Sequence, residues 1–103
     1  MPHPAIDFAP DDQVLYLGIP DSAVIRDAAS QLTRGVLVVI DDGERVRASR
    51  REFRDLTNVM FVPGTPGEIP WRDGFFTRVI DTRQGDWPNP HRVAAEITRI
   101  TRR

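Results

Sequence analysis

The sequence predicts a single α/β domain in which about four mainly parallel strands carry helices on both faces. The apolar runs at 14–17 and 36–40 contain no alternating polar residues, which is typical of parallel strands buried on both faces. The residues between these runs follow helical spacing, and strands that alternate with helices are joined by right-handed crossovers into a parallel sheet. With 103 residues and no internal repeat, the chain has room for one core. We expect four strands and three helices in three layers, about half of a doubly wound domain.

The first helix is expected to begin at Asp21 or Ser22, directly after the strand at 14–17. Both residues have a short side chain with an oxygen, which can accept hydrogen bonds from the first free N–H groups of a helix. The apolar face of this helix is formed by Val24, Ile25, Ala28, Ala29 and Leu32. The strand at 36–40 follows, and its five residues are mostly β-branched.

The second half of the chain repeats the alternation of helix and strand. In order, the expected elements are a helix at 44–56, a strand at 59–62, a loop rich in Pro and Gly at 63–74, a strand at 75–80 (Phe75 to Ile80) and a last helix. Asn89 is a favoured N-cap residue for the last helix. Pro90 suits its first position, because an N–H there would have no partner within the helix.

Composition excludes several classes of protein. The chain has no Cys, which excludes disulfides, thiolate metal sites and a Cys nucleophile. No secretion signal is evident at the N-terminus and no apolar stretch approaches the ~18 residues of a membrane span, so we expect a cytoplasmic protein without a membrane partner. The net charge is −1, and acidic residues interleave with the arginines at 44–56, so we expect no nucleic-acid partner. Residues 1–12 are expected to form a flexible arm and residues 13–103 the domain.

Three stretches resemble the class I, S-adenosylmethionine-dependent methyltransferases. APDDQVLYLG (9–18) is similar to the stretch that leads into strand one of that family, and NVMFVPGTPGEIPWRDGFFTRVID (58–81) resembles its strand three, acidic loop and strand four. DWPNPHRVAAEITRITR (86–102) resembles the helix before strand five. The resemblance implies a Rossmann-like sheet of order 3-2-1-4 and a cofactor cleft at the carboxyl ends of its strands. It reaches only the beginning of the fifth of seven strands, so we expect a truncated domain.

The first cofactor motif of that family, an acidic residue followed by GxGxG, is degenerate in this chain. Tyr16 stands in place of the acidic residue, and Gly18 matches the first glycine. Pro20 and Ser22 replace the other two glycines, and Pro20 lacks an N–H and adds a ring beside the ligand position. Asp21 is expected to accept from the first helical N–H groups, where an anionic ligand group would otherwise bind.

Two further cofactor anchors can be carried over from the resemblance. Asp41, with Asp42 beside it, stands where the family has the acid that binds the ribose. An equally good interpretation is that these acids stabilise the N-terminus of the next helix through its dipole. Thr65 replaces the acid that contacts adenine, and its hydroxyl is a weaker acceptor than a carboxylate. The candidate cofactor-binding residues are therefore Gly18, Asp41, Asp42 and Thr65.

The loss of these motifs leads us to expect a methyltransferase-like domain that has lost catalysis. We predict no catalytic set and no metal site, since His3 and His91 have no partners at ligand spacing. An interaction, oligomerisation or regulatory role without a cofactor is the favoured hypothesis. The alternative is a domain that still binds S-adenosylmethionine or a nucleoside and works as a methyltransferase only with a second chain.

The predicted strand at 75–80 indicates how such a domain would contact a partner. In the family that the sequence resembles, strand five covers the outer edge of this strand, and the resemblance does not extend that far. A hydrophobic edge strand offers unpaired backbone groups to another chain. We therefore expect a homodimer, or a protein partner, that covers the edge from Phe75 to Ile80.

Overall fold

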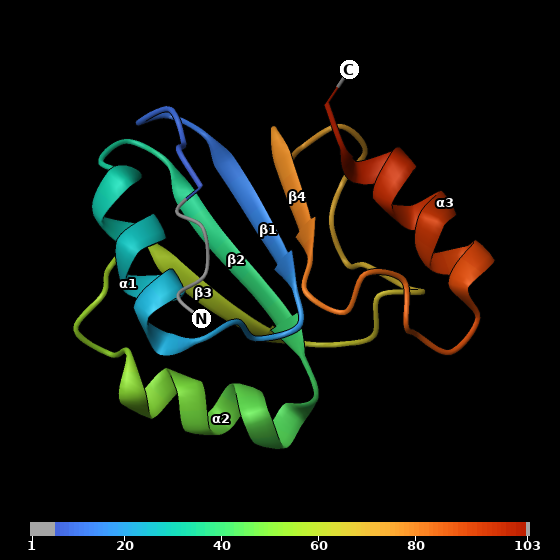
Figure 1. Ribbon diagram of the computed structural model, residues 1–103, viewed down its shortest axis with the longest axis horizontal. Coiled ribbons are helices and arrows are strands. Elements are labelled where there is room, and N and C mark those ends of the chain that lie inside the picture. Colours follow the sequence, from blue (N-terminus) through green and yellow to red (C-terminus); the bar gives the residue numbers. More distant parts are fainter. Residues whose placement is uncertain (1–5, 103) are drawn as a thin grey trace.

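A computed structural model describes residues 6–102 and shows a four-stranded sheet with helices on both faces (Figure 1). The strands are β1 (Gln13–Leu17), β2 (Val36–Asp41), β3 (Val59–Pro63) and β4 (Arg78–Asp81). The helices are α1 (Ser22–Gln31), α2 (Gly43–Glu52) and α3 (Pro90–Ile100). The strands are parallel and their order is β3-β2-β1-β4, which confirms the predicted fold class and topology.

The central strand β1 separates two layers of the core. Its residues pair with β2 on one side and β4 on the other, and Tyr16 lies opposite both Val39 and Ile80. Because side chains alternate along a strand, Val14 and Tyr16 pack under α1 and α2, whereas Leu15 and Leu17 pack under α3. All four side chains are buried. The apolar run without alternation thus reflects a strand that is covered on both faces.

Helix α2 is shorter than predicted, because it ends at Glu52 instead of 56. The Phe53 N–H closes the helix on the Ser49 carbonyl, and the Phe53 ring then stacks on Phe61 of β3 with ring centroids 5.7 Å apart. The chain must reverse direction before β3 begins at Val59, so residues 53–57 form turns. Phe53 and Leu56 nevertheless pack against the core under α1 and α2.

The fourth strand is Arg78–Asp81 and not 75–80, so that prediction was wrong at its start. Phe76 is fully buried and packs edge-on against Phe75 and within 5.6 Å of Trp71, measured between ring centroids. Its N–H donates to the Ile100 carbonyl (3.0 Å), and its carbonyl accepts from the Arg102 N–H (2.7 Å). The aromatic pair therefore fills the core under α3, and the strand begins only after it.

Residues 6–12 belong to the predicted N-terminal arm and lie against α1 and β4; residues 1–5 fall outside the described part. The Gln31 side chain accepts from the Phe8 N–H (2.8 Å) and donates to the Ile6 carbonyl (2.9 Å). The Arg78 guanidinium stacks over the Phe8 ring at 5.3 Å from its centroid. Side-chain and backbone contacts thus attach this part of the arm to the domain.

Candidate functional site

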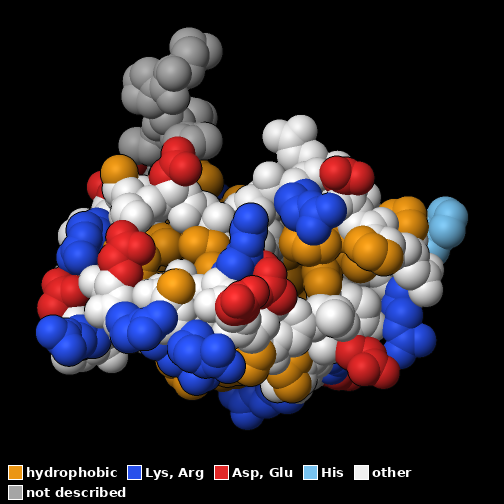
Figure 2. All heavy atoms as spheres, turned by 90° about the horizontal axis from the view of Figure 1, so that it is seen from below, with side chains coloured by type: hydrophobic (Ala, Val, Ile, Leu, Met, Phe, Trp, Pro, Cys, Tyr) orange, Lys and Arg blue, Asp and Glu red, His pale blue; other side chains and the backbone are white. Residues whose placement is uncertain are grey.

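A cleft of about 1050 Å³ opens at the carboxyl ends of β1, β2 and β4. The loop after β1, the start of α2 and the loop after β4 form its walls, and Tyr16, Gly18, Asp41, Asp42, Asp81 and Trp87 are among the lining residues. Figure 2 views this end of the sheet, where hydrophobic side chains lie in a hollow between clusters of charged ones. The cleft is the place at which the resemblance locates a cofactor.

Gly18 lies in the cleft in a conformation that favours glycine, with φ +88°. Its N–H donates to the Ile40 carbonyl (2.8 Å), which holds the loop against β2. A Cβ at this position would collide with the Thr82 hydroxyl and meet the Trp87 ring at 3.5 Å. The space beside the Gly18 backbone is therefore filled by the loop after β4.

Asp81 organises the loop that covers Gly18. Its carboxylate accepts from the Trp87 indole N–H (2.8 Å) and from the Gly85 N–H (2.8 Å). The Arg83 guanidinium stacks on the Trp87 ring, 4.2 Å from its centroid. Sequence analysis did not single out Asp81 or Thr82 as site residues, because only the tertiary fold brings residues 81–87 next to Gly18.

Asp41 stands at the end of β2 and is tied to the chain's own backbone. Its Oδ2 accepts from the Ile19 N–H (2.9 Å), and its Oδ1 accepts from the Asp42 N–H (2.7 Å). The Arg45 guanidinium lies 3.7 Å from Oδ2, and the side chain of Asp41 is only 13% exposed. Asp41 thus links the loop after β1 to the start of α2.

Asp42 is the N-cap of α2. Its Oδ1 accepts from the N–H groups of Glu44 (3.1 Å) and Arg45 (3.0 Å), which leaves the carboxylate at the helix N-terminus where the dipole favours it. This is the structural role that we considered for these acids. Asp42 also lines the cleft, so its position alone does not decide whether it contacts a ligand.

Two predicted features lie differently from expectation. Thr65 does not line the cleft; it forms a turn after β3 in which its carbonyl accepts from the Glu68 N–H (3.1 Å). Asp21 is the N-cap residue of α1 by position, but its side chain makes no capping hydrogen bond; its carbonyl accepts from Val24 and Ile25. The structure therefore brings Gly18, Asp41 and Asp42 together and places Thr65 elsewhere.

Tyr16 lines the cleft in place of the family's acidic residue. Burial raises the pKa of its hydroxyl, the Asp27 carboxylate raises it further, and the Arg78 guanidinium partly opposes this. A neutral phenol with a raised pKa is not a base at neutral pH. Tyr16 therefore does not supply the negative charge that the replaced acid would have carried.

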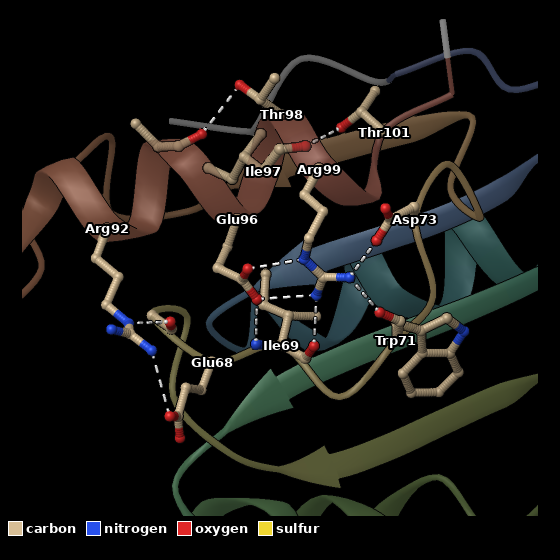
Figure 3. Close-up of polar contacts among 12 residues, drawn as sticks. Glu68, Ile69, Trp71, Asp73, Arg92, Glu96, Ile97, Thr98, Arg99 and Thr101 are labelled. Atoms are coloured by element: carbon tan, nitrogen blue, oxygen red, sulfur yellow. Dashed lines mark hydrogen bonds and ion pairs between the residues drawn. The ribbon is translucent and has the colours of Figure 1, made fainter.

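A clamp on α3 holds the loop that carries Thr65 (Figure 3). Arg99 uses all five guanidinium N–H groups: two bind the Glu96 carboxylate, and the others bind the Ile69 carbonyl, the Trp71 carbonyl and Asp73. Glu96 also accepts from the Ile69 N–H (2.8 Å). The hydrogen bonds from Arg99 hold the pKa of Glu96 down, at about 2.

Within residues 6–102, no three His, Asp or Glu side chains are placed to hold a metal ion together. The helices of the described chain are all too short or too polar to cross a membrane.

Comparison with solved structures identifies the fold. A methyltransferase of Aquifex aeolicus that depends on S-adenosylmethionine matches 88% of this chain with a TM-score of 0.77 and 18% identity. A putative methyltransferase of Bacillus halodurans matches 96% with a TM-score of 0.76 and 21% identity. The putative methyltransferase of Haloferax volcanii, solved with a methyltransferase activator, matches 91% with a TM-score of 0.78 and 22% identity. The fold is methyltransferase-like and truncated.

The chain spans only 51%, 43% and 42% of these three structures, respectively. No protein-family model matches the sequence, and no curated protein does. Identities of this size show a shared fold, and a shared fold does not carry an activity with it. The function of this methyltransferase-like domain must therefore be argued from the residues of the cleft.

The residues present do not fit S-adenosylmethionine well. On the side where a Cβ would stand, the Gly18 backbone is covered by Thr82 and Trp87. The Asp41 carboxylate already accepts two backbone hydrogen bonds, and Thr65 lies outside the cleft. Of the anchors that the resemblance implies, Gly18 and Asp41 are engaged within the chain, Thr65 lies outside the cleft, and Asp42 caps α2 while it lines the cleft.

Proposed function

We propose that this methyltransferase-like domain does not transfer methyl groups and acts through contacts with other proteins in the cytoplasm. An interaction, oligomerisation or regulatory module needs a stable folded surface but no cofactor. The altered cleft supports this proposal, and it agrees with the loss of the glycine motif at Pro20 and Ser22.

The state of Asp41 is the observation that carries the proposal. A ribose that binds this carboxylate would share it with the N–H groups of Ile19 and Asp42 and with the nearby Arg45 guanidinium, which already use about half of its acceptor positions. Losing a hydrogen bond to a charged group costs about 1.5–3 kcal/mol, and less at the exposed Asp42 N–H, where water can replace the acceptor. The carboxylate therefore acts as a bridge between two loops, and binding a ligand there would weaken that bridge.

The glycine end of the cleft supports the same proposal. Pro20 has no N–H to offer to an anionic group, and its ring fixes the backbone of the loop. The Thr82 hydroxyl donates to the Leu17 carbonyl (2.7 Å), which keeps the loop after β4 against β1. A ligand that approached Gly18 from the side of Thr82 and Trp87 would have to displace these two side chains.

One observation favours a second candidate function. The cleft of about 1050 Å³ is as large as the pockets of roughly 300–1,000 Å³ that hold small ligands, and Gly18, Asp41 and Asp42 all line it. The alternative is therefore a domain that binds S-adenosylmethionine or a related nucleoside and becomes a methyltransferase only with a second chain. The two candidate functions make opposite predictions for one experiment, the titration of the chain with S-adenosylmethionine.

Isothermal titration calorimetry of the full chain with S-adenosylmethionine and S-adenosylhomocysteine distinguishes them. We expect no heat of binding at millimolar ligand. A saturable signal with a Kd of about 10 μM or tighter, near −7 kcal/mol, would refute the proposal. Asp41→Ala would then have to abolish that signal, whereas Asp55→Ala, an exposed acid outside the cleft, would leave it unchanged.

A further inference from the structure

Four arginines of α2 and the turn after it share the side of the helix that lies next to β3. Arg47, Arg50 and Arg51 are spaced at i, i+3 and i+4, and Arg54 follows after the helix. Arg50 fixes the direction of this side, because its guanidinium donates twice to the Phe61 carbonyl of β3, with donor–acceptor distances of 3.1 and 2.8 Å. All four arginine side chains are exposed. Figure 2, which looks up at α2, shows basic side chains in a row at the lower left.

The acidic residues that interleave with these arginines in the sequence have partners elsewhere. The Glu52 carboxylate accepts from the Ser22 hydroxyl of α1 (2.7 Å), and Asp55 pairs with Arg26 of α1 at 3.1 Å. Glu44 lies in the first turn of α2, where the helix dipole favours it. Within residues 6–102, no ion pair includes any of the four arginines. The side of α2 next to β3 is therefore positively charged, although the sequence predicts a mixed face.

An apolar groove of about 260 Å³ adjoins the four arginines. Arg50 and Arg54 line it together with five apolar residues, which are Phe53, Leu56, Val59, Met60 and Phe61. Val59 and Phe61 pack toward α2, and Met60 lies on the opposite face because side chains alternate along a strand, so the groove passes around the edge of β3. Among the described residues, Met60 is the only large hydrophobic side chain that is exposed, at 49%. We call the four arginines and this groove the α2–β3 surface.

A partner at the α2–β3 surface is not expected to pair with β3 as an added strand. Arg50 already occupies the Phe61 carbonyl, and Pro63 ends the strand without an N–H to offer. A charged side chain and a proline are devices that keep an edge strand from pairing with another chain. Contacts would therefore be made by side chains: carboxylates for the guanidinium groups, and an apolar side chain for the groove.

We propose that the α2–β3 surface binds an acidic segment of a different protein, which places an apolar side chain in the groove beside Met60. This inference rests on the proposed function, since it names the partner through which the domain acts. A second copy of the chain fits less well, because a two-fold axis here would bring the same arginines near one another. A nucleic acid fits less well, because the two aromatic rings at this surface, Phe53 and Phe61, are buried and cannot stack on bases.

A displayed library of short random segments tests the chemistry of the partner. Its positions hold Asp, Glu, Lys, Arg, Ser, Leu, Met or Phe in equal proportion. The library is selected on the immobilised full chain, and the most enriched segment is synthesised and measured by fluorescence anisotropy. We expect Asp and Glu to be enriched over Lys and Arg around at least one Leu, Met or Phe, and we expect the affinity to fall as salt is added.

Two pairs of arginine substitutions separate the local charge from the net charge of the chain. Arg51→Ala combined with Arg54→Ala should weaken peptide binding about 3–10-fold at low salt, since two exposed ion pairs with the peptide are lost. The matched control combines Arg72→Ala with Arg102→Ala, which removes two exposed arginines near α3. Both variants change the net charge equally, so only the first should lose affinity.

Met60 tests the apolar contact independently of charge. Met60→Thr keeps a residue that suits a strand and removes most of the apolar side chain, so we expect about 3–10-fold weaker binding at any salt concentration. Met60→Leu keeps the apolar volume and should bind the peptide as the unaltered chain does. Equal affinities of the Thr and Leu variants would overturn the placement of an apolar side chain in the groove.

Nuclear magnetic resonance on the unaltered chain gives a readout that does not depend on the folding of a variant. The Nε–H resonances of Arg51 and Arg54 and the methyl resonance of Met60 should shift when the peptide is added, whereas the Nε–H resonance of Arg102 should not. Shifts at none of the first three groups would overturn the proposal. So would a library without enrichment, an enrichment of basic residues, or full affinity in the Arg51 and Arg54 double variant.

Competitors for the same surface complete the test. A strand of poly(dT) or vesicles of phosphatidylserine that bound the chain more tightly than the peptide would overturn the proposal in favour of a nucleic acid or a membrane. A dimer in sedimentation velocity that Met60→Thr disperses would overturn it in favour of a second copy. The calorimetric titration probes the cleft, whereas these experiments probe the α2–β3 surface, so the two proposals fail separately. A chain that binds both S-adenosylmethionine and the peptide would remove the proposed function and leave the acidic partner standing.

Discussion

Glu96 provides the sharpest test of how the loop between β3 and β4 is held. We predict that Glu96→Gln lowers the free energy of unfolding at neutral pH, because the amide keeps the shape of the side chain but loses the charge that binds Arg99. Two hydrogen bonds from Arg99 and one from the Ile69 N–H converge on this carboxylate. The glutamine can accept at only one of its two terminal atoms.

The magnitude follows from the pKa of Glu96, which the hydrogen bonds from Arg99 lower from 4.5 to about 2. At about 1.4 kcal/mol per pKa unit, this shift corresponds to an upper bound of roughly 3–4 kcal/mol. The side chain is 19% exposed, so solvent screening reduces the effect, and we expect about 1–3 kcal/mol. Hydrogen bonds to charged groups contribute about the same amount.

The pH dependence has a definite sign. Because the pKa of Glu96 is lower in the folded than in the unfolded chain, its contribution is fully present above about pH 4.5. It decreases as the pH falls from there toward about 2, where the carboxylate is protonated in the folded chain as well. The difference between the unaltered chain and Glu96→Gln should therefore be large at pH 7 and should nearly vanish near pH 2.

Urea unfolding measures this difference, followed by tryptophan fluorescence, to which Trp71 and Trp87 both contribute. Arg99 binds the carbonyl of Trp71. Comparing the two proteins at each pH removes the contribution of all other acids. Glu44→Gln, in the first turn of α2, is the control, and its effect should stay near or below ~0.5 kcal/mol at pH 7. A Glu96→Gln effect below ~0.5 kcal/mol at pH 7, or one of equal size at pH 2.5, would refute the reasoning.

Three further substitutions test the fold around the cleft and the core under α3. Gly18→Ala should lower the free energy of unfolding in urea by about 2–4 kcal/mol, because Gly18 has a positive φ and a Cβ there would collide with Thr82. Gly43→Ala, with open space around it, should change little, and equal effects of the two substitutions would contradict this account. Asp42→Ala should cost ~1 kcal/mol through loss of the α2 cap, and an unchanged midpoint would show that the cap is dispensable. Phe76→Ala should cost about 3–5 kcal/mol by thermal unfolding, and a loss below 1 kcal/mol would mean that the core under α3 closes around the vacancy.

Local patterns in the sequence were sufficient for most of the fold. The apolar runs that became β1 and β2, and the helical spacing from Val24 onward, predicted buried parallel strands and a covering helix. This works because burial on both faces removes the polar residues from a strand. Gly18 and Asp41 follow directly after these strands, and the resemblance implied that both lie in the cleft, which they line.

The failures concern residues whose partners lie far along the chain. Phe76 continues an apolar run that predicts a strand, but its ring is needed in the core under α3, and its backbone pairs with residues 100–102. Thr65 follows β3 as the resemblance implies, yet the turn closed by Glu68 turns it away from the cleft. Neither outcome can be read from neighbours in the sequence.

The sequence by itself determined the alternation of strands and helices and the buried faces of β1 and β2, and the resemblance supplied their order in the sheet and the end of the sheet at which the cleft lies. Only the tertiary structure decided where α2 ends and β4 begins, and what fills that cleft. Trp87 and Thr82 reach Gly18, and Arg50 reaches Phe61, through contacts between residues far apart in the chain. Such contacts depend on how side chains of separate elements share space, and no local periodicity encodes this.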